Sequence, residues 1–283
     1  MKVAVTGATG FVGRHVVSEI LRRRLTPTLV VRSDSVQSLD FMDLPRIVMD
    51  VHHPDPSGLQ QLAACDVLLH LAWGGLPRYR SLHHFESELP AHYHFLKRAV
   101  GAGLKRLVVA GTCAEYGLQS GSLTEDMPSL PAHSYALAKD CLHKQLRQLQ
   151  RDLPFELTWA RIFYLYGQGQ AQNSVLAQLQ SALERGESQF NMSGGEQLRD
   201  YLPVTEAAHL LVSLAMHAAP AGLVNVCSGQ PISIRRLVEE WLVREQRSIS
   251  LNLGHYPYPD FEAMAFWGDV SWLKRCLNPD RDS

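Results

Sequence analysis

The chain has 283 residues, of which 46% are hydrophobic and 19% are charged, and its formal net charge is −1. This composition is typical of a globular protein with a substantial core. The near-neutral charge offers no electrostatic attraction to nucleic acid or to an anionic membrane, so neither is expected as a partner. No apolar segment is long enough to span a bilayer, and the five cysteines form no CxxC pair. We therefore expect a reduced, cytoplasmic protein.

In the first half of the chain, short apolar runs alternate with helical patterns. The apolar runs predict strands at residues 2–7, 27–32, 46–50, 66–73 and 106–112. Helical patterns are found at 12–24 and 85–103, and Pro90 should bend or break the second of these helices. Strands that alternate with helices in this way predict an α/β fold with a doubly wound parallel sheet.

After residue 166 the pattern changes. It predicts helices at 173–188, 204–219 and about 233–246, a polar loop at 191–200 and a late strand at 222–229. We therefore expect a Rossmann-like dinucleotide-binding core at 1–166, to which 200–230 return. A smaller C-terminal substrate-binding lobe would be formed by 167–199 and 231–283, with the substrate cleft between the two parts.

The segment TGATGFVG carries Gly7, Gly10 and Gly13 directly between a predicted strand and a predicted helix. Gly7 permits a tight turn, Gly10 lets the backbone approach a diphosphate, and Gly13 lets the helix pack closely on the strand. The helix N-terminus then faces the phosphate charge, so this segment predicts a dinucleotide site. Apart from the three glycines and the residues that end the second predicted strand, the expected cofactor contacts are Thr9, Phe11, Val12, Asp50, Val51, Leu71, Ala72, Trp73, Tyr135, Lys139 and Ile162.

The end of the second predicted strand bears on the choice between NADP and NAD. An NAD site favours an acid there, because the acid accepts hydrogen bonds from the ribose hydroxyl. This chain has Arg32 followed by Ser33, and a guanidinium suits the 2′-phosphate of NADP. NADP is therefore the expected cofactor. NAD stays open, because Arg32 could instead stack on the adenine and Asp34 could reach the ribose.

Three residues predict hydride-transfer chemistry. The segment YALAK places Tyr135 and Lys139 four residues apart, on one face of a helix. A free tyrosine has a pKa of about 10, and the lysine ammonium can stabilise the phenolate, so the tyrosine can act as an acid or base. Thr112, at the end of the fifth strand, can hold the same substrate oxygen. We expect Thr112, Tyr135 and Lys139 to be the catalytic residues.

Together these motifs resemble the extended short-chain dehydrogenase/reductases of the NAD-dependent epimerase/dehydratase family that act on nucleotide sugars. The similarity includes TGATGFVG, HLAWG, GTCAEYG, YALAK, RIFYLYG, GGEQLRDYLPVTEAA and NVCSG. The resemblance implies a Rossmann-like domain, NADP or NAD, and a nucleoside-diphosphate sugar under the small lobe. It also implies a homodimer in which the segment 85–100 and the YALAK helix pair with a second copy.

The segment GTCAEYG distinguishes between reactions within that family. The resemblance implies that 4,6-dehydratases carry Asp-Glu directly after the threonine, and here these positions are Cys113 and Ala114. Glu115 lies one residue further, and in an extended segment it would point to the opposite face from Ala114. Elimination of water then lacks its acid and base. A reductase or an epimerase remains.

The resemblance also suggests which residues face the substrate. Arg199 matches the family arginine on the substrate diphosphate, although it could instead form a structural ion pair. Asn173 could receive phosphate or nucleotide at the start of a helix, or it could simply cap that helix. The expected substrate contacts are Trp73, Thr112, Cys113, Ala114, Tyr135, Tyr164, Asn173 and Arg199.

Thirteen histidines raise the question of a metal. His83 and His84 are adjacent and His92 and His94 are two apart, so on a helix each pair points in different directions, and no acid completes a clear triad. No metal site is expected.

The leading interpretation is an NADPH-dependent reductase of the 4-keto group of a 4-keto-6-deoxyhexose carried on dTDP or another nucleotide. The alternative is a nucleotide-sugar 4-epimerase with tightly bound NAD. A third interpretation, a catalytically inactive NADP-sensing regulator, is disfavoured because Tyr135 and Lys139 are both present.

Overall fold

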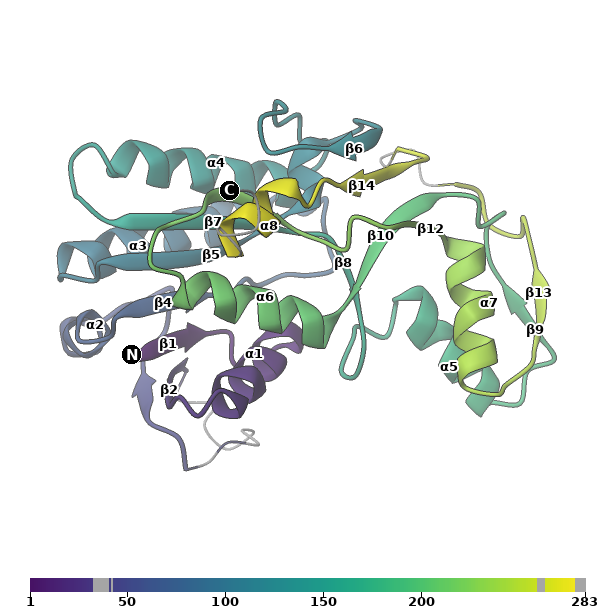
Figure 1. Ribbon diagram of the computed structural model, residues 1–283, viewed down its shortest axis with the longest axis horizontal. Coiled ribbons are helices and arrows are strands. Elements are labelled where there is room, and N and C mark those ends of the chain that lie inside the picture. Colours follow the sequence, from purple (N-terminus) through teal and green to yellow (C-terminus); the bar gives the residue numbers. More distant parts are fainter. Residues whose placement is uncertain (33–40, 42, 259–262, 278–283) are drawn as a thin grey trace.

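The computed structural model describes residues 1–32, 41, 43–258 and 263–277 (Figure 1). Its large sheet consists of β1 (Val3–Thr6), β2 (Pro27–Val31), β3 (Arg46–Val48), β4 (Val67–His70), β5 (Arg106–Thr112), β7 (Glu156–Ile162) and β11 (Gly222–Val226). The strand order is β11-β7-β5-β4-β1-β2-β3, and all neighbours are parallel. The expected Rossmann-like, doubly wound α/β sheet is thus confirmed.

Helices cover both faces of this sheet. One face carries α1 (Phe11–Arg22), α6 (Val204–Met216) and α8 (Ser271–Leu277), and the other carries α2 (Pro56–Ala63), α3 (Leu89–Gly101) and α4 (Ser134–Leu149). Side chains alternate along each strand, so Val3 and Val5 join the first core cluster while Ala4 joins the second. Because both faces are covered, the strands are nearly continuous apolar runs.

The sequence analysis named neither α2 nor β7, and it expected Pro90 to bend or break the helix at 85–103. A π-helical turn, His84–Glu88, leads directly into α3, and Pro90 lies in the first turn of α3. A proline is tolerated there because its missing N–H would have no partner within the helix. Pro90 therefore marks a change in helix type rather than a gap in the helix. Glu88, the last residue of the π turn, accepts a hydrogen bond from the Gly74 amide in the loop after β4.

The smaller part of the molecule lies to the right in Figure 1. Its core unites α5 (Val175–Glu184), α7 (Ile234–Arg244), β9 (Gln189–Asn191) and β13 (Ser250–Asn252). Three short strands lie between this core and the large sheet: β8 (Tyr164–Tyr166), β10 (Leu198–Pro203) and β12 (Pro231–Ser233). A separate pair joins β6 (Gly121–Leu123) to β14 (Phe266–Gly268).

The C-terminal part of the chain contributes residues both to the core of the large sheet and to the smaller core. Leu273 and Cys276 of α8 belong to the core cluster of the large sheet, whereas α7 belongs to the small core. The residues after 231, which the sequence analysis assigned to the small lobe, thus run from one part back to the other. Among the described residues, no helix has both the length and the apolar character that crossing a membrane requires.

Candidate active site

The glycine turn after β1 is shaped for close approach by a ligand. Gly7 has φ +70°, a conformation that favours glycine, and a Cβ there would lie 2.8 Å from the amide nitrogen of Ala72. A Cβ at Gly13 would lie 2.0 Å from the carbonyl oxygen of Gly7, so only glycine lets α1 pack this closely on β1. Gly10 caps α1 without a side-chain hydrogen bond, which leaves the helix N-terminus available to an anion. These features fit a dinucleotide diphosphate.

This turn opens into a cavity of about 360 Å³ at the carboxyl ends of the central strands, the edge at which such sheets bind ligands. The cavity is lined by Thr6, Gly7, Ala8, Thr9, Gly10, Val30, Val31, Arg32, Met49, Asp50, Val51, His52, Leu71, Ala72, Trp73, Gly74, Glu88 and His92. Most of the expected cofactor residues are thus together. Phe11, Val12, Gly13, Tyr135, Lys139 and Ile162 are not part of this lining, and Ser33 lies outside the described residues.

Asp50 has a structural role beside its place in the cavity. Its Oδ1 accepts a hydrogen bond of 2.9 Å from the amide of His52, so the carboxylate shapes the turn after β3. That leaves Oδ2 as an acceptor that can face the cavity. Arg32 lies at the end of β2 and is exposed along the same cavity, as the interpretation of a 2′-phosphate partner requires.

The three expected catalytic residues come together just beyond this cavity. Tyr135 and Lys139 lie on the first two turns of α4, whose start is capped by the His133 side chain accepting from the amide of Ala136. Thr112 ends β5, and its hydroxyl lies close enough to the Tyr135 side chain to favour the ionised phenol and so to lower its pKa. Lys139 Nζ donates to the carbonyl oxygen of Ala110, also on β5, at 2.8 Å. The end of β5 therefore holds both catalytic side chains of α4.

Electrostatics make Tyr135 an acid rather than a base in the free protein. Burial raises the pKa of Tyr135, and the neighbouring Glu115 carboxylate raises it further, against the effect of the Thr112 hydroxyl. Burial also lowers the pKa of Lys139 to about 7, although Glu115 and Glu88 favour its ammonium form. The Tyr-Lys spacing suggested that Lys139 would stabilise the phenolate and so lower the pKa of Tyr135. In the protein without cofactor or substrate, the pKa of Tyr135 is raised instead. At neutral pH Tyr135 carries a proton that it can donate.

The GTCAEYG segment is not extended as assumed; residues Cys113–Tyr116 form a 3-10 helix. Glu115 points into the core and is fully buried. Its carboxylate accepts from the Thr112 amide at 2.9 Å, from Trp159 Nε1 at 3.1 Å and from Arg161 Nε at 2.8 Å. Glu115 is thus committed to holding the end of β5. Cys113 is buried in an apolar cluster, and Ala114 has no proton to transfer.

Trp73 connects the cavity to the catalytic residues. Lys139 Nζ lies 4.1 Å from the centre of the Trp73 ring, and the Tyr135 ring is 6.1 Å away. The indole Nε1 donates to His84 Nδ1 at 3.1 Å, while His84 Nε2 lies 3.0 Å from the carbonyl oxygen of Arg78. His84 must donate from Nε2 to that oxygen, so Nδ1 is free to accept only in the neutral ring. Burial lowers the pKa of His84 and favours this neutral form.

The expected substrate residues of the small lobe differ in their surroundings. Tyr164 lies on β8 and packs against the rings of Tyr201 and Phe266. Arg199 is 1% exposed; it donates to the carbonyl oxygens of Leu198 and Met264, and its guanidinium lies 4.6 Å from the Phe266 ring centre.

The sequence left open whether Arg199 forms an ion pair with its neighbour and whether Asn173 caps a helix, and the structure bears on both. Asp200, the neighbour of Arg199, accepts from the backbone amides of residues 228, 229 and 268, so it has its own structural task. Asn173 is exposed and does not cap α5, because that N-cap is Ser174, whose side chain accepts from Ala177. A binding role for Arg199 or Asn173 stays a prediction.

The sequence analysis missed the far wall of the cavity, formed by His52, Gly74, Glu88 and His92. Glu88 accepts from the Gly74 amide at 2.6 Å and from His92 Nε2 at 3.1 Å. Burial lowers the pKa of His92 to about 4. Burial alone would raise the pKa of Glu88, but the hydrogen bonds from His92 and Gly74 outweigh it and bring this pKa to about 2. The i,i+4 spacing of Glu88 and His92 was the available signal in the sequence.

Comparisons with known proteins show the family to which the chain belongs. The family described as NAD dependent epimerase/dehydratase matches residues 3–227. The chain is 28% identical over 273 residues to dTDP-6-deoxy-L-talose 4-dehydrogenase (NAD(+)) of Aggregatibacter actinomycetemcomitans, covering 95% of this chain and 99% of the relative. It is 21% identical over 257 residues to dTDP-4-dehydro-6-deoxyglucose reductase of Escherichia coli, covering 84% and 79%.

Solved structures show the same architecture. MoeE5 in complex with UDP-glucuronic acid and NAD superposes with a TM-score of 0.81 at 26% identity, covering 98% of this chain and 92% of that one. UDP-N-acetylglucosamine 4-epimerase from Methanobrevibacter ruminantium M1 gives a TM-score of 0.86 at 24% identity, covering 98% and 91%. The match to the family extends over most of the chain and includes the glycine turn, Thr112, Tyr135 and Lys139. This protein therefore belongs to the NAD dependent epimerase/dehydratase family and is an extended short-chain dehydrogenase/reductase.

Proposed function

We propose that the protein is a nucleotide-sugar enzyme that reduces the 4-keto group of a nucleotide-activated 4-keto-6-deoxyhexose, with NADPH as the reductant and dTDP as the carrier. The observation that carries this proposal is the catalytic set itself. The Thr112 hydroxyl lies beside the Tyr135 side chain, and Lys139 donates to the carbonyl oxygen of Ala110 on the same strand, β5. The positions where elimination would need an acid and a base hold Cys113 and Ala114. The two relatives named above act, by their names, at position 4 of dTDP-linked 6-deoxy sugars.

The chain's own residues can provide the proton and the oxyanion contacts. When bound, a nicotinamide dinucleotide supplies the hydride. Tyr135, protonated at neutral pH, donates its proton to the ketone oxygen, and the Thr112 hydroxyl binds the same oxygen and orients it. Lys139 faces the resulting phenolate from the next turn of α4 and stabilises it. Glu115 contributes only by holding Thr112 in place through its amide.

The preference for NADPH rests on Arg32, which borders the cavity at the end of β2. A guanidinium can bind a 2′-phosphate with several donors at once. NAD is the competing cofactor, and the name of the relative from Aggregatibacter actinomycetemcomitans specifies NAD(+). The substrate contacts proposed for the other side are Trp73, Cys113, Ala114, Tyr164, Asn173 and Arg199. A homodimer through α3 and α4 is part of the same proposal.

The experiment uses dTDP-4-keto-6-deoxyglucose with NADPH that carries deuterium at the transferable position. We expect one NADPH to be consumed per ketone and a 6-deoxyhexose that carries deuterium at C4. In parallel, dTDP-glucose and a dTDP-6-deoxyhexose are incubated with oxidised cofactor, and the products are analysed by mass and chromatography. The 6-deoxyhexose should be oxidised at C4 in the reverse reaction, and dTDP-glucose should lose no water.

Each contrary result has a distinct meaning. Conversion of a 4-hydroxy sugar to an isomer of equal mass, without net consumption of cofactor, would establish the 4-epimerase with tightly bound NAD instead. Loss of water would overturn the assignment of Cys113 and Ala114. The Tyr135→Phe variant serves as the control that any observed reaction uses this site.

A further inference from the structure

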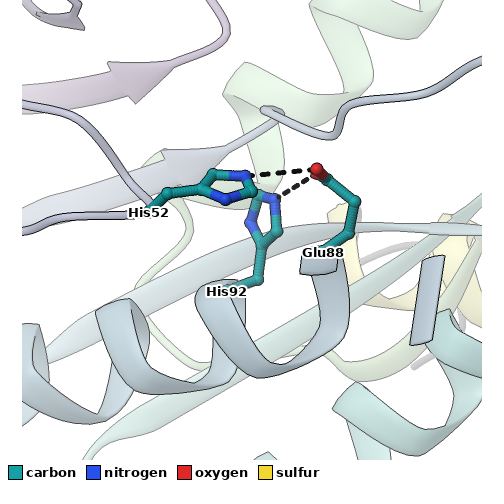
Figure 2. Close-up of side chains that lie close together, drawn as sticks. All are labelled: His52, Glu88 and His92. Carbon is teal, nitrogen blue, oxygen red and sulfur yellow. Dashed lines mark hydrogen bonds and ion pairs between the residues drawn. The ribbon is translucent and has the colours of Figure 1, made fainter. Parts of the chain in front are cut away.

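Three side chains from separate segments converge in the wall of the cavity (Figure 2). His52 comes from the loop after β3, Glu88 ends the π-helical turn, and His92 lies one turn further along on α3. Their ligand atoms all lie within 4.8 Å of one another. His52 Nε2 is 3.1 Å from Glu88 Oε1, and His92 Nε2 is 3.1 Å from Glu88 Oε2. Glu88 thus lies between two imidazoles, each of which faces it with its Nε2 atom.

This spacing is close to that of a tetrahedral metal site. Zinc binds imidazole nitrogen and carboxylate oxygen at about 2.0–2.2 Å, which places neighbouring ligand atoms about 3.3 Å apart. The two nitrogen–oxygen pairs need to open by only a few tenths of an ångström. His83 Nε2 also lies 3.0 Å from Glu88 Oε1, but it is not among the three residues whose ligand atoms all lie within 4.8 Å of one another. We propose that His52, Glu88 and His92 bind a divalent transition-metal ion of the zinc type, with the fourth position open to water.

The charge and burial of these groups suit a cation. The side chains of Glu88 and His92 are 3% and 2% exposed, so both are already desolvated before an ion arrives. Glu88 accepts hydrogen bonds from the Gly74 amide and from His92 Nε2, and a carboxylate together with neutral imidazoles is the form in which these side chains bind a metal. His52 and His83 are about one-third and two-fifths exposed, which gives an ion a path from solvent.

Neighbouring groups hold the ligands in the way that metal sites require. The Gly74 amide donates to Glu88 Oε2, and His92 Nδ1 lies 2.7 Å from Nε2 of the buried His70. His70 Nδ1 in turn lies 2.9 Å from Thr6 Oγ1. Such partners orient the ligating ring and select its tautomer. His70 therefore acts as a positioning residue for His92.

The direction of these hydrogen bonds reveals what metal binding must change. Thr6 Oγ1 accepts from the amides of Leu71 and Ala72, so in the metal-free protein its hydrogen points to His70 Nδ1. His70 then donates to His92 Nδ1, and His92 donates from Nε2 to Glu88. A metal needs the Nε2 lone pair, so the hydrogens of both rings must shift, with His92 donating to His70 and His70 to Thr6. Thr6 Oγ1 then has to accept from His70. The hydrogen bond from the Ala72 amide, which at 3.3 Å is the longer of the two amide contacts, can be given up for this.

This proposal departs from the absence of metal expected from the sequence, and the fold supplies the reason. The sequence argument held for His84, which binds Trp73, and for His94, which is exposed on the other side of α3. It did not consider Glu88, which lies one helical turn before His92, or His52, which approaches Glu88 from the loop after β3. The proposal does not depend on the proposed reductase activity, since its test measures metal binding alone.

The test uses the full chain without a polyhistidine tag, treated with chelator and titrated with zinc chloride in a calorimeter at neutral pH. We expect one zinc ion per chain. Glu88→Gln and His92→Gln should each weaken binding by about tenfold or more, and His52→Gln should do the same without disturbing the core, because its side chain is partly exposed. His94→Gln on the same helix is the matched control and should bind as the wild type does. Cobalt(II) in place of zinc should give the visible absorption of a tetrahedral site.

Two results would overturn the proposal. One is the absence of stoichiometric zinc binding to a wild-type protein that is folded by circular dichroism. The other is zinc binding that is equally tight in the wild type and in the His52→Gln and Glu88→Gln variants, which would assign the ion to other surface groups. If Glu88→Gln does not fold, the His52→Gln and His94→Gln pair decides between the outcomes.

Discussion

Replacing Glu115 with glutamine should destabilise the protein far more than it slows catalysis. The carboxylate is fully buried, and it pairs with the Arg161 guanidinium, whose side chain is 3% exposed, at 2.8 Å. Arg161 also lies over the Tyr116 ring, 4.2 Å from its centre, so the guanidinium cannot turn toward water. Glutamine keeps the shape and one acceptor oxygen but removes the charge. The variant therefore leaves a buried cation without its counter-ion.

The expected magnitude follows from this burial. Removing one partner of a buried ion pair costs about 3–5 kcal/mol of unfolding free energy. For a chain of 283 residues, the entropy of unfolding is about 0.6 kcal/mol per kelvin, so the thermal midpoint should fall by about 5–8 °C. The matched control is Glu156→Gln, which removes the partner of Arg106 at a site where Glu156 is 44% exposed. A surface pair of this kind contributes less than about 1 kcal/mol.

Calorimetry gives the two midpoints, and steady-state kinetics well below both gives kcat. If Glu115 is structural, kcat of the Glu115→Gln variant should fall by less than about tenfold, whereas loss of a catalytic acid costs roughly a hundred- to ten-thousand-fold. The reasoning is refuted by a variant that keeps the wild-type midpoint and loses a hundredfold or more in kcat. That result would make Glu115 a proton donor and reopen elimination as the reaction.

Three further predictions concern the cavity and the catalytic residues. Tyr135→Phe should lower kcat by roughly a hundred- to ten-thousand-fold, while NADPH affinity, measured by fluorescence quenching, stays within a few-fold; near-normal turnover would remove Tyr135 from the mechanism. NADPH should bind more tightly than NADH, and Arg32→Asp should reverse the order by about tenfold or more, since a charge-assisted hydrogen bond contributes about 1.5–3 kcal/mol; equal wild-type affinities would count against the 2′-phosphate site. Burial lowers the pKa of Lys139 from 10.5 to about 7, so between these values the unfolded chain binds more protons and the unfolding free energy of the cofactor-free protein should rise with pH. Lys139→Met should flatten that rise in urea unfolding measured at pH 7 and pH 9.5, and an unchanged slope would contradict the lowered pKa.

The sequence alone determined the features that depend on neighbours along the chain. The apolar runs of β1, β2, β4 and β5 and the glycine turn before α1 are local patterns, so periodicity and turn chemistry were sufficient to predict the parallel α/β sheet and the dinucleotide site. Tyr135 and Lys139 share a helix face for the same reason, because four residues make about one turn. Their contact with Thr112 could be anticipated once β5 was expected to end beside that helix.

Only the tertiary structure decided where the ionised and imidazole groups point. Glu115 is turned inward by Trp159 and Arg161, which lie on β7 more than forty residues later and meet it only because β7 pairs with β5. In the same way, His52 reaches Glu88 from the segment that leads from β3 at the sheet edge back to α2 and β4. A local pattern contains the spacing of residues within an element. It does not contain the order of the strands, and that order determines which distant side chains share a buried space and what their charges can bind.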